Sequence, residues 1–216
     1  MIVMFGTPKG GTGKTTLLTN LAAMLVAKGR SVAILKAEKN EELQVWYDRR
    51  REAGLPMMPL HEAFGDIQNE MTRLQKMADI VLVDTAGHDS REFRSGLMRA
   101  DVLLSPLRPS SQVEIDNLPK LTQIVRAVQV KENPGLKAYV LFNRCKTSSH
   151  KDAIDLAAAL NSDPDWLPSL RTCVSFLDVF ETAVNLGGGV HDVERASSLG
   201  KARGQIELLA KEIGLI

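Results

Sequence analysis

The sequence has little cysteine and no long apolar run. Cys145 and Cys173 are its two cysteines, and their spacing matches no metal-ligand pattern. We therefore expect two buried or partly buried thiols in a reducing compartment. The apolar start, Met1–Phe5, lacks the basic segment of a signal peptide, and no stretch is long enough to span a bilayer. These absences favour a cytoplasmic protein that does not enter a membrane.

The chain also has almost no net charge. It contains 27 lysines and arginines against 26 aspartates and glutamates, which leaves +1 at pH 7. Such a balance supplies no overall field that would attract nucleic acid, so DNA binding would require a local basic face. A hydrophobic fraction of 44% is typical of a globular protein, and 216 residues suffice for one domain with a full core.

Short apolar runs alternate with helical stretches, and no repeat or linker divides them. We expect a single domain over residues 1–216, built as a doubly wound, mostly parallel α/β sheet with helices on both faces. Strands are predicted at Ile2–Phe5, Ser31–Leu35, Asp79–Val83, Val102–Ser105, Ala138–Phe142 and Leu170–Val174. Helices are predicted from Lys14 to a stop at Gly29, and near Glu41–Glu52, Asp66–Met77, Glu114–Gln129, Asp152–Leu160, Leu177–Leu186 and Ser198–Ile213.

A glycine-rich segment separates the first predicted strand from the first helix. It reads Pro8-Lys9-Gly10-Gly11-Thr12-Gly13-Lys14-Thr15-Thr16, in the strand–loop–helix context that a P-loop requires. Glycines let backbone N–H groups turn toward phosphate oxygens, and the helix N-terminus adds a partial positive charge. We predict that Lys14 contacts the β- and γ-phosphates, Thr15 ligates Mg²⁺ and Thr16 contacts the α-phosphate. Proline replaces a usual glycine at Pro8, and a turn without a ligand is the alternative.

A second nucleotide segment is predicted where the strand near residue 80 ends. Asp84 follows an apolar run, in the position of a Walker B aspartate that holds Mg²⁺ through water. Gly87 is placed to approach the γ-phosphate with its backbone N–H, as a switch loop does. An aspartate at a strand end can also be a plain turn residue, but its pairing with a P-loop favours the nucleotide role.

The segment Asn143-Arg144-Cys145-Lys146 bears on the choice of base. Related GTPases use Asn-Lys-x-Asp at this strand end, and the aspartate accepts hydrogen bonds from guanine. Lys146 stands at the aspartate position and cannot accept them. We therefore predict ATP as the nucleotide. Asn143 is a candidate for contacting the base edge, with a strand-ending turn residue as the alternative.

Residues 9–15 resemble the deviant Walker A motif of the ParA/MinD family. That motif carries a second lysine ahead of the glycines, here Lys9. The resemblance implies that Lys9 reaches across a nucleotide-sandwich homodimer to the partner's phosphates. A second ammonium beside a transferring phosphoryl group stabilises the charge that grows in the transition state. A solvated loop lysine is the alternative.

Later segments are similar to the family as well. Asp101–Ser110 looks like its strand and proline loop beside the adenine, which implies base contacts from Pro106 and Pro109. Ala138–Arg144 looks like the next strand, whose end also borders the base. Ala202–Glu207 opens a terminal helix like that of the short plasmid-partition ParA proteins, and we expect no added N-terminal DNA-binding domain.

One segment departs from the family pattern. After its second strand the family usually has an aspartate, one residue and then a second, hydrolysis-linked aspartate, whereas this chain has Lys36-Ala37-Glu38. Glu38 keeps a carboxylate but extends it by one methylene, and geometry near a phosphoryl group is exacting. We expect an ATPase that is slow or uses an altered geometry. A charged loop that leads into a helix is the alternative.

The resemblance implies a DNA-segregation ATPase. ATP closes a homodimer, the dimer binds nucleoid DNA without sequence preference, and a small centromere-binding partner of the ParB/ParG kind triggers hydrolysis. The predicted DNA contacts are Arg195, Lys201 and Arg203, with Lys211 further along the same predicted helix. Neighbouring acids offset these cations in number, so a basic face would depend on their arrangement.

Two other classes stay open. A MinD-like membrane-positioning ATPase would carry a basic amphipathic helix at its C-terminus. Residues 206–216 are amphipathic, but Glu207 and Glu212 suit an anionic bilayer poorly, so a core-packing helix is favoured. The third class is a metabolic P-loop enzyme, an amidoligase or a reductase. Its iron–sulfur branch needs a cysteine just after the switch segment, and none lies between Asp84 and Asp101.

Overall fold

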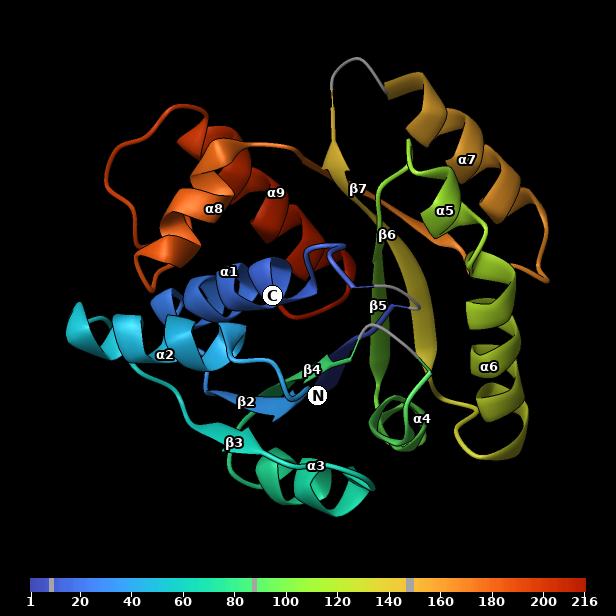
Figure 1. Cartoon of the computed structure of the whole chain (residues 1–216), viewed down its shortest axis with the longest axis horizontal. Coiled ribbons are helices and arrows are strands. Elements are labelled where there is room, and N and C mark those ends of the chain that lie inside the picture. Colours follow the sequence, from blue (N-terminus) through green and yellow to red (C-terminus); the bar gives the residue numbers. More distant parts are fainter. Residues whose placement is uncertain (8–9, 87–88, 147–149) are drawn as a thin grey trace.

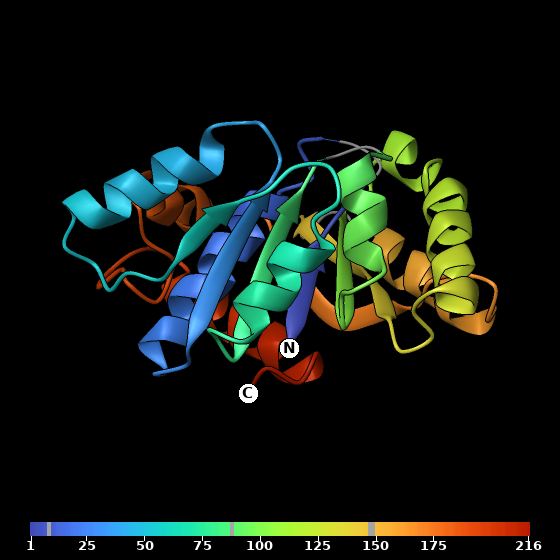
Figure 2. The same ribbon diagram turned by 90° about the horizontal axis from the view of Figure 1, so that it is seen from below.

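The computed structural model describes residues 1–7, 10–86, 89–146 and 150–216. Its strands form one seven-stranded sheet in the order β3-β2-β4-β1-β5-β6-β7, and every neighbouring pair is parallel. Helices cover both faces of this sheet (Figures 1 and 2). The predicted doubly wound fold is therefore confirmed.

The six predicted strands start within one residue of the prediction, and all but β1 extend further at their ends. They are β1 (Ile2–Phe5), β2 (Val32–Ala37), β3 (Leu60–Glu62), β4 (Ile80–Thr85), β5 (Val102–Leu107), β6 (Lys137–Cys145) and β7 (Ser169–Ser175). β3 was not predicted, because its three residues, Leu-His-Glu, form no apolar run and none of them is fully buried. It pairs with β2 at the edge of the sheet.

Most predicted helices are present. The helices are α1 (Lys14–Ala27), α2 (Glu42–Glu52), α3 (Gln68–Gln75), α4 (Arg91–Leu97), α5 (Gln112–Ile115), α6 (Leu118–Lys131), α7 (His150–Ser162), α8 (Asp178–Asn185) and α9 (Leu199–Glu212). The single helix predicted over Glu114–Gln129 is wrong, because the chain forms α5 and then starts α6 afresh with Pro119 in its first turn. The short helix α4 was not predicted.

Each face of the sheet has its own apolar layer. Helices α1, α2, α8 and α9 cover one face, where Leu18, Trp46 and Ile206 belong to the same buried cluster. Helices α3, α4, α6 and α7 cover the other face, with Met71 and Val125 among their buried residues. The central strands contribute to both layers, which explains why they are apolar without alternation.

The strand order changes direction at β1, which lies between β4 and β5. In an open parallel sheet, ligands bind beyond the carboxyl ends of the strands at such a switch point. The register pairs Phe5 of β1 with Asp84 of β4, and Asp84 with Lys36 of β2. The segments predicted to bind phosphate therefore start from one edge of the sheet.

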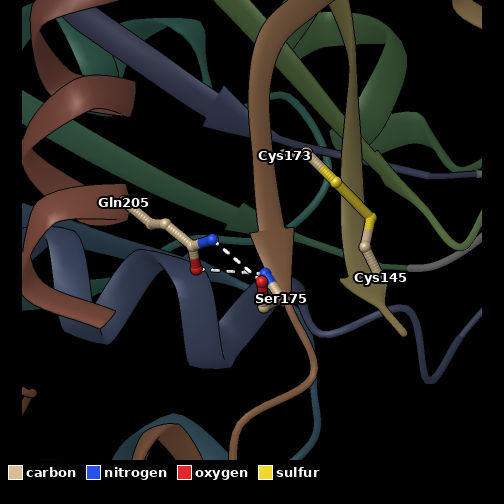
Figure 3. Close-up of a disulfide and its surroundings, with 4 residues drawn as sticks. All are labelled: Cys145, Cys173, Ser175 and Gln205. Atoms are coloured by element: carbon tan, nitrogen blue, oxygen red, sulfur yellow. Dashed lines mark hydrogen bonds between the residues drawn. A yellow bond between two sulfur atoms is a disulfide. The ribbon is translucent and has the colours of Figure 1, made fainter. Parts of the chain in front are cut away.

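The two cysteines form a disulfide, so the prediction of free thiols is wrong. Cys145 ends β6 and Cys173 lies in β7, with their Cα atoms 6.8 Å apart (Figure 3). The residues are 28 positions apart in sequence, but β6 and β7 are neighbours in the sheet. Sequence spacing did not reveal the pair, because the strand order alone brings these two ends together.

Candidate nucleotide site

The phosphate loop has the backbone that its glycines predict. Gly11 and Gly13 adopt left-handed conformations with φ of 79° and 88°. A side chain at Gly13 would also meet the Asn143 amide, since a Cβ atom there would lie 2.5 Å from Nδ2. Among the described residues no side chain caps the start of α1, so its first N–H groups are left for an anion. Pro8 and Lys9 lie outside the described residues.

Four predicted site residues meet where the loop joins α1. Thr15 Oγ1 donates a hydrogen bond of 3.0 Å to Asp84 Oδ2, across the gap between α1 and β4. Lys14 is 6% exposed, and its Nζ lies 3.9 Å from Glu38 Oε2. The structure therefore brings an ammonium, a hydroxyl and two carboxylates together beside the phosphate loop. Gly87, predicted to follow Asp84 at this site, lies outside the described residues.

Asp84 is a fully buried carboxyl group. Burial raises its pKa from 3.8 to about 7, although the Lys14 ammonium and the Thr15 hydroxyl oppose that rise. Its Oδ1 accepts no hydrogen bond from any residue in the described part of the chain. A buried carboxylate is costly without a counter-charge, and oxygen donors are the ligands that Mg²⁺ prefers. Thr15 and Asp84 therefore fit a hydrated Mg²⁺ ion.

Lys36 and Glu38 point to different partners. Lys36 is 3% exposed, and its Nζ lies 2.7 Å from Glu62 Oε1 and 3.8 Å from Glu41 Oε1. Glu62 belongs to the unpredicted strand β3, so the sequence offered no signal for this pair. The lysine at the family's first acidic position is thus neutralised away from Lys14, and Glu38 is the acid that approaches the phosphate loop.

A cavity of about 570 Å³ opens beside the start of α1. Thr15 and Thr16 form its inner side, and Arg144 lines it from the end of β6. The segment after β7 completes it with Ser175 and Phe176, and the Phe176 side chain is 53% exposed. Ser175 and Phe176 were not predicted to line the site, because which strand ends lie beside the loop depends on the strand order.

The residues predicted to contact the base differ in their placement. Asn143 lines the cavity but is 5% exposed, and its Nδ2 donates a 2.8 Å hydrogen bond to the Thr12 carbonyl of the phosphate loop. Pro106 lies within β5, paired with Leu141 of β6, and neither it nor Pro109 is among the residues that line this cavity. Asn143 therefore supports the loop, and the prolines are not part of this lining.

The predicted DNA contacts also divide into two kinds. Arg195 and Lys201 are exposed near the start of α9. Arg203 is only partly exposed, and its guanidinium donates hydrogen bonds to the carbonyls of Val190 and Val193. It holds the segment before α9 in place, so Arg195 and Lys201 are the two that present free surface.

The apolar side of the C-terminal helix packs into the core. The sequence offered Ile206, Leu209, Ile213 and Ile216 as a membrane face. The first three are at most 7% exposed, whereas Ile216 is 44% exposed. Within the described ranges, no helix combines the length and the apolar character needed to cross a bilayer. The favoured expectation of a core-packing helix is confirmed.

A parallel sheet with a glycine-rich loop at its switch point, an inward lysine and a Thr–Asp pair define a P-loop nucleotide-binding protein. Residues 3–170 match the family model of the CobQ/CobB/MinD/ParA nucleotide binding domain. The chain belongs to this family, which confirms the resemblance seen in the sequence.

Known relatives agree with this assignment. The chain is 30% identical over 186 residues to maintenance of carboxysome distribution protein A of Halothiobacillus neapolitanus, covering 84% of this chain and 82% of the relative. It superposes on a Cyanothece McdA variant in complex with ATP, with a TM-score of 0.74, 16% identity and coverage of 99% and 96%. MinD of Pyrococcus horikoshii with Mg-ADP gives a TM-score of 0.72, 17% identity and coverage of 99% and 97%. At these identities the two solved structures show a shared fold.

Proposed function

We propose that the protein is a Mg²⁺-dependent ATPase that positions a cargo in the cell, specifically by ATP-controlled DNA binding. The observation that carries the nucleotide part is the Lys14–Thr15–Asp84 cluster at the switch point, where Asp84 Oδ1 is buried without a partner among the described residues. The relative named for carboxysome distribution supports positioning as the general role. DNA segregation is the specific form that we propose.

The site residues have distinct proposed tasks. The Lys14 ammonium contacts the β- and γ-phosphates and balances their charge. Thr15 and Asp84 would hold Mg²⁺, and the bound ion would supply positive charge against the phosphate oxygens. Glu38 lies 3.9 Å from Lys14 and orients the attacking water. The base occupies the cavity beside Thr16 and the exposed ring of Phe176.

The DNA step depends on a dimer. We propose that ATP closes a homodimer in which Lys9 reaches the partner's phosphates, and that a small ParB/ParG-like protein stimulates hydrolysis. Arg195 and Lys201 are the proposed DNA contacts, because both are exposed near the start of α9. A closed dimer doubles the number of cations that meet DNA phosphates at one time.

DNA co-sedimentation with ADP, ATP and a slowly hydrolysed ATP analogue tests this function. We expect binding with ATP and the analogue but not with ADP, and a steep loss of binding as salt rises. Arg195→Ala with Lys201→Ala should weaken binding to every sequence and flatten the salt dependence. The matched control replaces Lys131 and Lys137, two exposed lysines elsewhere, by alanine. Equal binding with and without nucleotide would exclude the proposed switch.

A liposome arm in the same experiment separates the MinD-like alternative. We expect no ATP-dependent binding to anionic vesicles, because Ile206, Leu209 and Ile213 are buried in the core. Binding to vesicles without binding to DNA would favour the membrane class and overturn our proposal.

A further inference from the structure

The disulfide joins the two strand ends that carry Arg144 and Ser175 of the nucleotide cavity, while both cysteines belong to the apolar layer on the other face of the sheet. Arg144, directly before Cys145, lines the cavity, and so does Ser175, two residues after Cys173. We propose that Cys145 and Cys173 form a reversible oxidation site, and that opening this disulfide lowers the affinity of the cavity for nucleotide. The inference rests on the proposed nucleotide binding.

One end of the disulfide is linked to the phosphate loop. Asn143 donates to the Thr12 carbonyl at 2.8 Å, and Arg144 Nη1 donates to the Gly11 carbonyl at 2.9 Å. Arg144 has a φ of 53°, a left-handed conformation that favours glycine and persists only where the surroundings hold it. Asn143 and Arg144, whose side chains hold the phosphate loop, form its brace. Cys145 is the next residue, so its disulfide to β7 is one of the restraints on this strained brace.

The other end is anchored to α9. Ser175 N donates to Gln205 Oε1 at 3.1 Å, and Gln205 Nε2 donates to Ser175 Oγ at 2.9 Å (Figure 3). The β6–β7 ladder shifts register between Phe142 and Cys145, so backbone pairing is irregular where the disulfide crosses. The bond from Phe176 N to the Cys145 carbonyl, 3.0 Å, continues the connection beyond the strands. The disulfide thus joins the end of β7, which Gln205 anchors to α9, to the Asn143–Arg144 brace of the phosphate loop.

The chemistry requires a thiol reductant. The thiolate of a low-molecular-weight thiol attacks Cys173 Sγ, which is more exposed than Cys145, and Cys145 leaves as a thiolate that takes up a proton. A second reductant thiol attacks the mixed disulfide and releases the Cys173 thiol. Two reductant thiols supply two electrons and two hydrogens, and they leave as one small-molecule disulfide. A small-molecule disulfide reverses the sequence and closes the bond again.

The oxidised form should bind nucleotide more tightly. With the bond closed, Asn143, Arg144 and the segment from Ser175 are ordered before the ligand arrives, whereas after reduction the ligand must order them. We expect the Kd for ADP to rise by about three- to tenfold on reduction, the scale for immobilising one or two side chains. The change should be similar for ATP, because the brace contacts the part of the loop common to both complexes.

The experiment measures the thiols and the nucleotide affinity on the same samples. Full-length protein is treated with oxidised glutathione or with dithiothreitol, the reagents are removed, and thiols are counted after denaturation. We expect none in the oxidised sample and two in the reduced one. Calorimetry with Mg-ADP then gives Kd for each form. The double variant Cys145→Ser with Cys173→Ser is the matched control, and it should show the weaker affinity after either treatment.

The outcomes distinguish the two proposals. Equal Kd values for samples with no thiols and with two thiols would overturn the switch and leave nucleotide binding intact. Two thiols after oxidation would likewise overturn it, because the pair would not close. Absence of ADP binding in both forms would refute the proposed function, and the inference would fall with it.

Discussion

Replacing Asp84 by asparagine should stabilise the nucleotide-free protein at alkaline pH, although it removes a residue proposed to hold Mg²⁺. The side chain is fully buried, and burial raises its pKa from 3.8 to about 7. At roughly 1.4 kcal/mol per pKa unit, this rise corresponds to a cost of about 4 kcal/mol for burying the ionised form. That figure already includes the attraction between Asp84 and Lys14, which opposes the rise in pKa.

The dependence on pH has a definite sign. Below about pH 4 the carboxyl group is protonated in the folded and the unfolded chain, so ionisation costs nothing. As the pH rises toward 7, the unfolded chain releases a proton that folded Asp84 retains, and the free energy of unfolding falls. Above about pH 7 both forms are ionised and the cost is constant. Asparagine does not titrate, so the gain from Asp84→Asn should be larger at pH 8 than at pH 5.

Urea unfolding at these two pH values, without Mg²⁺ and nucleotide, measures the effect. Asp79→Asn is the matched control, because it makes the same substitution at an exposed position directly before the same strand. The reasoning is refuted if Asp84→Asn is less stable than the wild type at pH 8, or if its gain does not grow with pH. Mg-ATP should reverse the order of stability, because Mg²⁺ stabilises the Asp84 carboxylate of the wild type and lacks this ligand in the variant.

The remaining predictions concern the lysines and Glu38. Lys14→Ala should weaken ATP binding by about a hundredfold, which calorimetry measures, because the buried ammonium is the main side-chain cation beside the phosphates; unchanged affinity would refute the site. Lys9→Ala should retain ATP binding and lose the ATP-induced dimer, and light scattering that still shows the dimer would exclude the cross-dimer contact. Glu38→Gln should slow hydrolysis by about a hundredfold with ATP affinity little changed, because it keeps the shape and removes the base; a phosphate-release assay that shows wild-type turnover would contradict its role.

The sequence predicted the centre of the fold better than its edges. Strands such as β1 and β4 are buried on both faces and read as continuous apolar runs, so their positions are visible locally. The edge strand β3 is short and partly exposed, and its place beside β2 follows from pairing across the sheet. No local pattern encodes that pairing, which is why the Lys36–Glu62 contact was also missed.

The candidate site likewise has a part that local sequence revealed and a part that depends on the strand order. Thr15 and Asp84 were predicted as a pair because a glycine loop and a strand-ending acid are recognisable within a few residues of sequence. Phe176 and the disulfide depend on β6 and β7 lying side by side, which is a property of the strand order. Arg203 was assigned to DNA by its charge, and its hydrogen bonds to Val190 and Val193 became visible only with the folded segment before α9.

The side chains of Asn143 and Arg144 hold two carbonyls of the phosphate loop. A diphosphate and a triphosphate would therefore meet the same two contacts. These contacts do not distinguish the two nucleotides, so a difference in behaviour between ADP and ATP would arise at the proposed cross-dimer lysine, Lys9, and in the segments after β2 and β4. The lifetime of the bound nucleotide and the discrimination between ADP and ATP would then depend on separate parts of the chain. Mutation could change either one while the other stays constant.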